Sequence, residues 1–158
     1  MKSDVSIAQN AGNYKIKVSG RASFECSPAL RNLAKSLENE KFKSMCIDLT
    51  SCESMDSTFM GVLAMLGLRA MKQNVSIEIA NASDFSKKLL DDLGVSRLFK
   101  FTETETAPDE EFESTVNDNI QEKNETVLEA HKTLMEIDDD NVEKFEKVVE
   151  FVKKDLGK

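Results

Sequence analysis

The sequence predicts an α/β fold, with strands and helices alternating along most of its first hundred residues. Three observations support this prediction. Residues 5–18 hold two stretches of alternating apolar and polar side chains around a Gly12-Asn13 turn, which is typical of a β-hairpin with one solvent-facing side. Residues 45–49 are mostly apolar, as expected of a strand buried on both faces of a parallel sheet. Residues 57–73 are apolar around most of a helical circumference and predict a long, buried helix.

Local signals place the remaining elements of this domain. A helix is predicted to start at Ser27-Pro28, because serine can cap the first turn and proline fits its first position. Residues 75–80 alternate as a strand, and residues 98–101 complete the sheet. Between them Ser83 or Asp84 caps another helix. The apolar side chains expected to face inward from that helix are Phe85, Leu89 and Leu93.

The composition changes beyond residue 102. Residues 103–125 hold nine acidic residues and one lysine, which equals the net charge of −8 of the whole chain. Few of them are apolar, so a flexible acidic linker is predicted. Residues 126–158 carry apolar side chains spaced three and four apart in two stretches, which predicts a helical hairpin. Because so small a hairpin cannot bury its own apolar stripes, we expect it to dock on the first domain, on a second copy or on a partner.

Charge and motif content argue against several classes of protein. An acidic chain without a basic patch repels phosphate backbones, so nucleic-acid binding is not expected. No apolar run approaches the roughly 20 residues of a membrane span, and we expect no membrane contact and a cytoplasmic location. The three cysteines form no CxxC pair, and His131 is the single histidine, so no disulfide framework, metal site or cofactor is predicted. We interpret His131 as a partly buried or surface residue, not a catalytic one.

The start of the long apolar helix is the strongest candidate site. Asp56 is expected to be its N-cap, accepting hydrogen bonds from amides that the first turn leaves unpaired. A phosphoryl group on Ser57 would lie close to those amides and to the positive end of the helix dipole. An ordinary cap followed by a hydroxyl has the same local sequence, so these residues alone leave both interpretations open.

Two motifs resemble the STAS domain, a family named for sulphate transporters and anti-sigma factor antagonists. The first comprises Ile47-Asp48-Leu49-Thr50, Met55-Asp56-Ser57-Thr58 and Gly61-Val62-Leu63, and the second covers residues 93–101. The resemblance spans about residues 5–102. It implies a STAS-like mixed sheet of four to five strands with helices packed against it. The expected organisation is a STAS-like domain (1–102), an acidic flexible linker (103–125) and a helical hairpin (126–158).

The resemblance also implies a function. In similar bacterial proteins the serine after the aspartate is phosphorylated by an ATP-dependent anti-sigma factor kinase, and only the unmodified form binds that kinase. By this resemblance the chain is an anti-sigma factor antagonist and not an enzyme, and its partner is an anti-sigma factor serine kinase. Ser57 is the expected phosphoacceptor, with Thr58 ranked second. The expected partner-binding residues are Glu53, Met55, Asp56, Ser57, Thr58, Phe59 and Met60.

Features of the sequence keep other roles open. Phe59 stands where family members often have glycine, and Gly20-Arg21 lacks the acidic residue that antagonists tend to carry there. The first alternative is therefore a non-catalytic scaffold or oligomerisation module in a signalling assembly, with homo-oligomer contacts supplied by the hairpin. A second is small-molecule sensing, although the sequence has no phosphate-binding loop.

Overall fold

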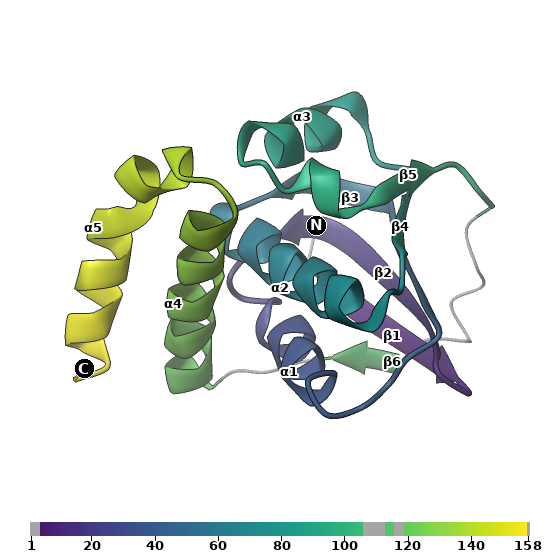
Figure 1. Cartoon of the computed structure of the whole chain (residues 1–158), viewed down its shortest axis with the longest axis horizontal. Coiled ribbons are helices and arrows are strands. Elements are labelled where there is room, and N and C mark those ends of the chain that lie inside the picture. Colours follow the sequence, from purple (N-terminus) through teal and green to yellow (C-terminus); the bar gives the residue numbers. More distant parts are fainter. Residues whose placement is uncertain (1–3, 106–112, 116–118, 158) are drawn as a thin grey trace.

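The computed structural model describes residues 4–105, 113–115 and 119–157, which form a mixed sheet covered by helices (Figure 1). The strands lie in the order β5-β4-β3-β2-β1-β6. They are β1 (Asp4–Asn10), β2 (Asn13–Ala22), β3 (Ser44–Met55), β4 (Ile77–Ala80), β5 (Lys100–Thr102) and β6 (Glu113–Thr115). The helices are α1 (Pro28–Ser36), α2 (Ser57–Gln73), α3 (Asp84–Asp92), the 3₁₀ turn η1 (Ser96–Leu98), α4 (Ile120–Ile137) and α5 (Asp140–Asp155).

The predicted fold class is confirmed. Strands β2 to β5 pair in parallel, whereas β1 pairs antiparallel with β2 and with β6. The two predicted C-terminal helices follow the domain. The sequence does not predict β6, which lies inside the expected linker and pairs with β1 so that Ser6 is opposite Ser114. A short strand at a sheet edge is held by main-chain hydrogen bonds, so it needs no alternating apolar pattern.

The first C-terminal helix begins earlier than the sequence indicates. Helix α4 starts at Ile120, inside the predicted linker, because the side chain of Asn119 accepts a hydrogen bond from the amide of Glu122 and caps the helix. Residues 106–112 and 116–118 of the predicted linker lie outside the described residues. The division of the chain at residues 102 and 125 stays a prediction.

Helix α3 places two of the three side chains expected to face inward as predicted: Leu93 is buried, and Leu89 is partly buried against the core. Phe85 is 57% exposed, whereas Leu90 is fully buried. The helix ends with the amide of Val95 donating to the carbonyl of Leu90, with Gly94 at a positive φ of 74°. The buried positions within α3 are Ser86 and Leu90, one turn apart, and Phe85 lies beside this line, so the prediction that Phe85 faces inward is wrong.

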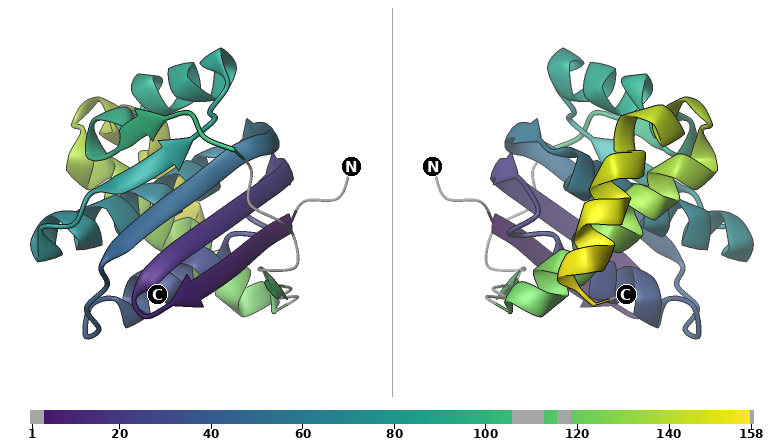
Figure 2. Two further views of the ribbon diagram at one scale, coloured as in Figure 1. Left: turned by 90° about the vertical axis from the view of Figure 1, so that its right-hand side faces the viewer. Right: turned by 90° about the vertical axis from the view of Figure 1, so that its left-hand side faces the viewer.

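Helix α2 lies between the sheet and the C-terminal hairpin. Helices α1 and α2 cover one face of the sheet, α4 packs on α2 and α1, and α5 packs on the outer side of α4 (Figures 1 and 2). Phe59, Val62 and Leu63 are fully buried in the same apolar core as the strand residues. Ala130 and Leu134 of α4 belong to that core too, so the hairpin is continuous with the domain.

Candidate functional site

The site begins at the junction between β3 and α2. Asp56 has an extended backbone (φ −92°, ψ 173°), and its carboxylate accepts from the amides of Phe59 and Phe24, each at 2.8 Å. One carboxylate therefore caps α2 and fixes the loop that follows β2. Burial raises the pKa of the Asp56 carboxyl, while these amide bonds and the nearby His131 ring act in the opposite direction. The predicted N-cap is present as expected.

Ser57 is the first residue of α2, and its side chain is bonded to the C-terminal hairpin. The Oγ atom of Ser57 lies 2.8 Å from Nε2 of His131 in α4. On its other side, Nδ1 of His131 lies 2.7 Å from the carbonyl oxygen of Val127. Because a carbonyl can only accept, Nδ1 must carry the proton and donate it. Nε2 of the neutral ring is then the acceptor, and the hydroxyl of Ser57 donates to it.

His131 is enclosed by the hairpin and the domain. The residue is only 3% exposed, and the ring of Phe145 in α5 meets the imidazole edge to face, with 4.9 Å between centroids. Burial lowers the pKa of His131 below its usual value of 6.5, against the smaller opposing effects of the Val127 carbonyl and Asp56. The docked arrangement therefore favours the neutral ring, which agrees with the hydrogen-bond pattern.

One turn further along α2, the two helices approach closely at Gly61. A Cβ atom added at Gly61 would lie 2.4 Å from the carbonyl oxygen of Ala130 and 2.6 Å from its Cβ. Real side chains do not come so near, so only glycine fits at this position while α4 is docked. The small residues at positions 61 and 130 let the helix backbones meet directly.

Ion pairs hold α4 against α1. The guanidinium of Arg31 donates to both carboxylate oxygens of Glu129, at 2.9 Å each, and to Glu125 at 3.1 Å. Lys35 lies 2.9 Å from Glu129. Burial disfavours ionisation of Glu129, but the bonds from Arg31 and Lys35 outweigh it and lower the pKa of this carboxyl. Arg31 is 6% exposed, so the forked pair is largely shielded from water.

The turn between α4 and α5 is attached to the end of α3. The side-chain amide of Asn141, which is fully buried, donates to the carbonyls of Leu93 at 2.9 Å and Leu134 at 2.8 Å. Arg97 donates to the carbonyl of Ile137. The hairpin is thus fixed at both ends of α4 as well as along α2.

The predicted partner-binding residues do not form one exposed surface. Glu53 is exposed, and Asp56 and Ser57 are half-buried. The other four are buried: Met55, Thr58, Phe59 and Met60. Phe59 lies wholly in the core, so its ring is not part of the exposed surface. The hairpin also covers Ser57 on the side of α4.

Sequence reasoning missed His131 as a member of this site. It lies 74 residues from Ser57, and no local motif links the two. The available signal is its register: His131 is adjacent to Ala130 and three residues before Leu134, on the apolar stripe of α4. A polar residue on a stripe predicted to dock is a candidate for a buried hydrogen bond.

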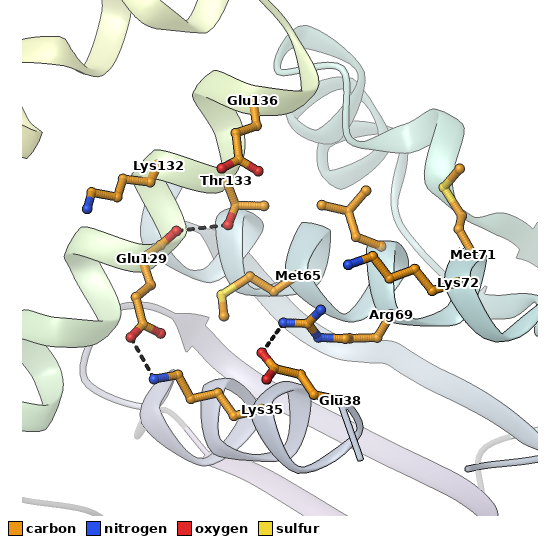
Figure 3. Close-up of a pocket in the computed structure, with 11 residues that line it drawn as sticks. Lys35, Glu38, Met65, Arg69, Met71, Lys72, Glu129, Lys132, Thr133 and Glu136 are labelled. Carbon is orange, nitrogen blue, oxygen red and sulfur yellow. Dashed lines mark hydrogen bonds and ion pairs between the residues drawn. The ribbon is translucent and has the colours of Figure 1, made fainter. Parts of the chain in front are cut away.

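A groove of about 800 Å³ opens at the far end of the α2–α4 contact (Figure 3). Met65 and Leu68 form its apolar floor, and charged side chains surround it, including Lys35, Glu38 and Lys132. Neither Ser57 nor His131 lines it. In the described part of the chain, no group of three or more His, Cys, Asp or Glu side chains could hold a metal ion, and no helix is long and apolar enough to cross a membrane.

Solved structures with the same architecture define the fold class. The anti-sigma factor antagonist SpoIIAA in its unphosphorylated form aligns with a TM-score of 0.53 and 12% identity, over 68% of this chain and 92% of that one. A Thermotoga maritima protein described as a candidate anti-sigma factor antagonist aligns with a TM-score of 0.52 and 14% identity, over 62% and 85% of the two chains. At these identities the likeness establishes the fold.

The sequence itself identifies the family. Residues 5–100 match the family model described as Mlab, STAS domain, and this chain belongs to the STAS domain family. No curated protein matches the sequence. The matched range ends before β6 and the hairpin. Helix α4, whose His131 is hydrogen-bonded to Ser57, therefore lies outside the family domain.

Proposed function

We propose that this chain is an anti-sigma factor antagonist, a binding module that associates with an anti-sigma factor serine kinase while Ser57 is unmodified. The supporting observation is the position of the Ser57 hydroxyl. It follows the capping Asp56 at the first position of α2, and it points away from the sheet toward α4. A partner that replaces α4 would therefore meet this hydroxyl directly. Such a kinase uses ATP, which fits a cytoplasmic location in a bacterium.

Phosphorylation at this position alters binding far more than it alters the domain. The start of α2 has the amides of the first helical turn and the positive end of the helix dipole, which favour a phosphate. The same phosphate adds about −1.5 to −2 charges at the contact surface. Burying that charge against a partner without a matching cation costs several kcal/mol, or several factors of ten in affinity. Modification would thus end binding.

Thr58 is a weaker candidate for the phosphoacceptor. Thr58 is 4% exposed, so it is almost inaccessible to a kinase in the folded chain. Ser57 is half-buried and therefore more accessible. The difference in burial supports Ser57 as the modified residue.

A pair of serine and histidine also occurs in hydrolases, and the geometry argues for binding instead. The histidine is oriented by the Val127 carbonyl and not by a carboxylate. Neither residue lines the 800 Å³ groove, or the pocket formed by residues 21–25 and 54–56. The hydroxyl consequently has no adjoining space for a substrate in either of these pockets.

The test compares full-length baits that differ only at Ser57, in lysate of the native host. We expect Ser57→Ala and Ser57→Gln to capture an ATP-binding serine kinase and Ser57→Glu to lose it by at least about tenfold, because the carboxylate introduces a charge that glutamine lacks. Quantitative mass spectrometry gives the enrichment. Incubation of the wild-type chain with the captured kinase and ATP should then modify Ser57, read by phosphopeptide mapping.

Equal capture by all three baits would contradict the proposal. The scaffold alternative makes a different prediction, because it requires a homo-oligomer formed through the hairpin. Light scattering of the full chain, with an exposed α5 residue changed in Phe151→Glu, would reveal such an oligomer as a mass that falls on substitution. Phe151 is 67% exposed, so this change leaves the described intramolecular contacts intact.

A further inference from the structure

We propose that the α4–α5 hairpin is a built-in competitor for the partner: it occupies the Ser57 face of α2, and a charge on Ser57 displaces it. This inference rests on the proposed function in one respect, namely that a partner binds the same face. The control of hairpin docking by Ser57 stands independently of any partner.

In its observed conformation the Ser57 hydroxyl points at the imidazole of His131. The hydroxyl oxygen is 2.8 Å from Nε2 of His131, and the ring is held from behind by the Val127 carbonyl and from the side by Phe145. A phosphorus atom bonded to this oxygen, with three further oxygens, must displace the imidazole. The ring cannot swing away without breaking its own bond to Val127. With the Ser57 side chain in this conformation, a phosphoryl group on its oxygen and a docked α4 exclude each other sterically.

The charge of a phosphoryl group on Ser57 also disfavours the docked hairpin, as its volume does. A docked neutral imidazole with Nδ1 donating presents only a lone pair toward position 57. An anion there would face an acceptor instead of a donor, next to the carboxylate of Asp56. An attractive pair would need a second proton on a ring that is 3% exposed. Releasing the hairpin into solvent avoids burying either the phosphate charge or a protonated imidazole.

The contacts of the docked hairpin also indicate which side chains a partner would need in order to replace it. Opposite Gly61 the partner must place a small residue, as α4 does with Ala130. Opposite Arg31 and Lys35 it must place carboxylates, as α4 does with Glu129 and Glu125. The face therefore fits an acidic amphipathic helix with a small residue at the crossing point. The apparent affinity of such a helix for the full chain equals its intrinsic affinity multiplied by the fraction of molecules in which α4 is undocked.

The test measures hydrogen exchange of α4 in the full chain, with the amides of β3 and β4 as the internal reference for global unfolding. We expect Ser57→Glu to speed exchange in α4 by about tenfold or more. The free energy cost of burying an unpaired charge is larger than the free energy that corresponds to a tenfold change in an equilibrium constant. Ser57→Gln has the same size without the charge and separates the two causes. It should release α4 less than Ser57→Glu does.

A second pair of variants changes the hairpin and leaves the domain untouched. Ala130→Leu inserts three carbons where the backbones of α2 and α4 meet, and should release α4. Lys132→Leu places the same leucine side chain at an exposed position of the same helix and should leave the α4 amides protected from exchange. Unchanged or greater protection of α4 in Ser57→Glu would overturn the inference, and so would equal effects of Ala130→Leu and Lys132→Leu.

The lysate experiment repeated with Ala130→Leu distinguishes the two proposals. If α4 is released and kinase capture rises relative to Lys132→Leu, both hold. If α4 is released by Ser57→Glu but no kinase is captured by the opened chain, the switch within the molecule holds and the proposed function fails. If α4 is equally protected in all variants and the kinase still binds, only the competitor is refuted.

Discussion

The two sides of α2 differ in the kind of contact they make. Toward the domain core, α2 presents large side chains that are fully buried, among them Phe59, Leu63 and Leu66. Toward α4 it presents a serine hydroxyl and Gly61, which meet a histidine and an alanine. The first contact is apolar and continuous with the core. The second combines small residues, a single hydrogen bond and ion pairs at its margin.

This difference indicates which contact can open. Separating α2 from the core would expose several large apolar side chains, each worth about 1.5–3 kcal/mol when buried. Separating the hairpin removes Ala130 and Leu134, and the partly buried Ile137 and Phe145, from the core, and returns polar groups to water, which solvates them again. The helix thus has one side that belongs to the permanent fold and one side whose cover is exchangeable.

The largest effect is expected on the permanent side. Phe59→Ala should lower the free energy of unfolding by about 3–5 kcal/mol, because a fully buried ring leaves a cavity. Urea denaturation followed by circular dichroism measures it. The matched control is Phe85→Ala on α3, where the ring is 57% exposed and the change should stay within about 0.5 kcal/mol. Similar losses at both positions would remove the distinction on which the comparison depends.

An intermediate effect is expected at the ion pairs of the exchangeable side. Arg31→Gln should weaken the docking of α4 by about 1–3 kcal/mol, since it removes the hydrogen bonds to the partly exposed Glu129. The readout is faster hydrogen exchange in α4 with β3 unchanged. Arg69→Gln is the control, because Arg69 bonds to Ala34 and Glu38 and not to the hairpin. Equal loss of α4 protection in both variants would show that the ion pair has no particular role.

The smallest effect is expected from pH and depends on His131. Its pKa is lowered by burial in the docked state, so the undocked state takes up a proton more readily. Docking should therefore be independent of pH well above 6.5 and weaken as pH falls through 6.5 toward the lowered pKa. The raised pKa of Asp56 opposes this trend, in the more acidic range where carboxyl groups titrate.

Because the chain has one histidine, NMR titration of the imidazole reports this site alone. We expect a pKa below 6.5 in the wild type and one closer to 6.5 in Ala130→Leu, where α4 is released. An identical pKa in the two proteins would mean that the substitution leaves the ring docked, or that docking does not desolvate it. The hydrogen-exchange profile of the same samples separates these two outcomes.

The sequence predicts most of the domain because its signals are local. The Asp56 cap, the extent of α2 and the left-handed Gly94 each depend on neighbours within one or two turns. The family motifs add the sheet topology, which local periodicity alone does not specify. The same local reasoning fails for Phe85, because the lines through Phe85 and Leu89 and through Ser86 and Leu90 are adjacent on a nine-residue helix, and packing against the domain buries the second.

The remaining features depend on contacts between distant segments. Pairing of β6 with β1 involves main-chain atoms and leaves no trace in side-chain pattern. The bond between Ser57 and His131 requires the register of α4 on α2, which is set by the close approach at Gly61. Nothing in residues 126–137 alone indicates that a glycine on another helix is their counterpart. The sequence therefore predicts the Ser57 hydroxyl at the start of α2, but not the contact of this hydroxyl with His131 of α4.

Strand β6 keeps an undocked hairpin close to the Ser57 face, where it competes with a partner. It fixes the chain to the sheet edge at Thr115, and the cap of α4 at Asn119 follows four residues later. Four residues span at most about 14 Å, at roughly 3.5 Å each. An undocked hairpin on so short a tether remains at an effective concentration on the order of millimolar, about a thousandfold above a partner present at micromolar levels. Because docking of the hairpin is intramolecular, the fraction of open faces depends on the chemistry at position 57 and not on the concentration of this chain.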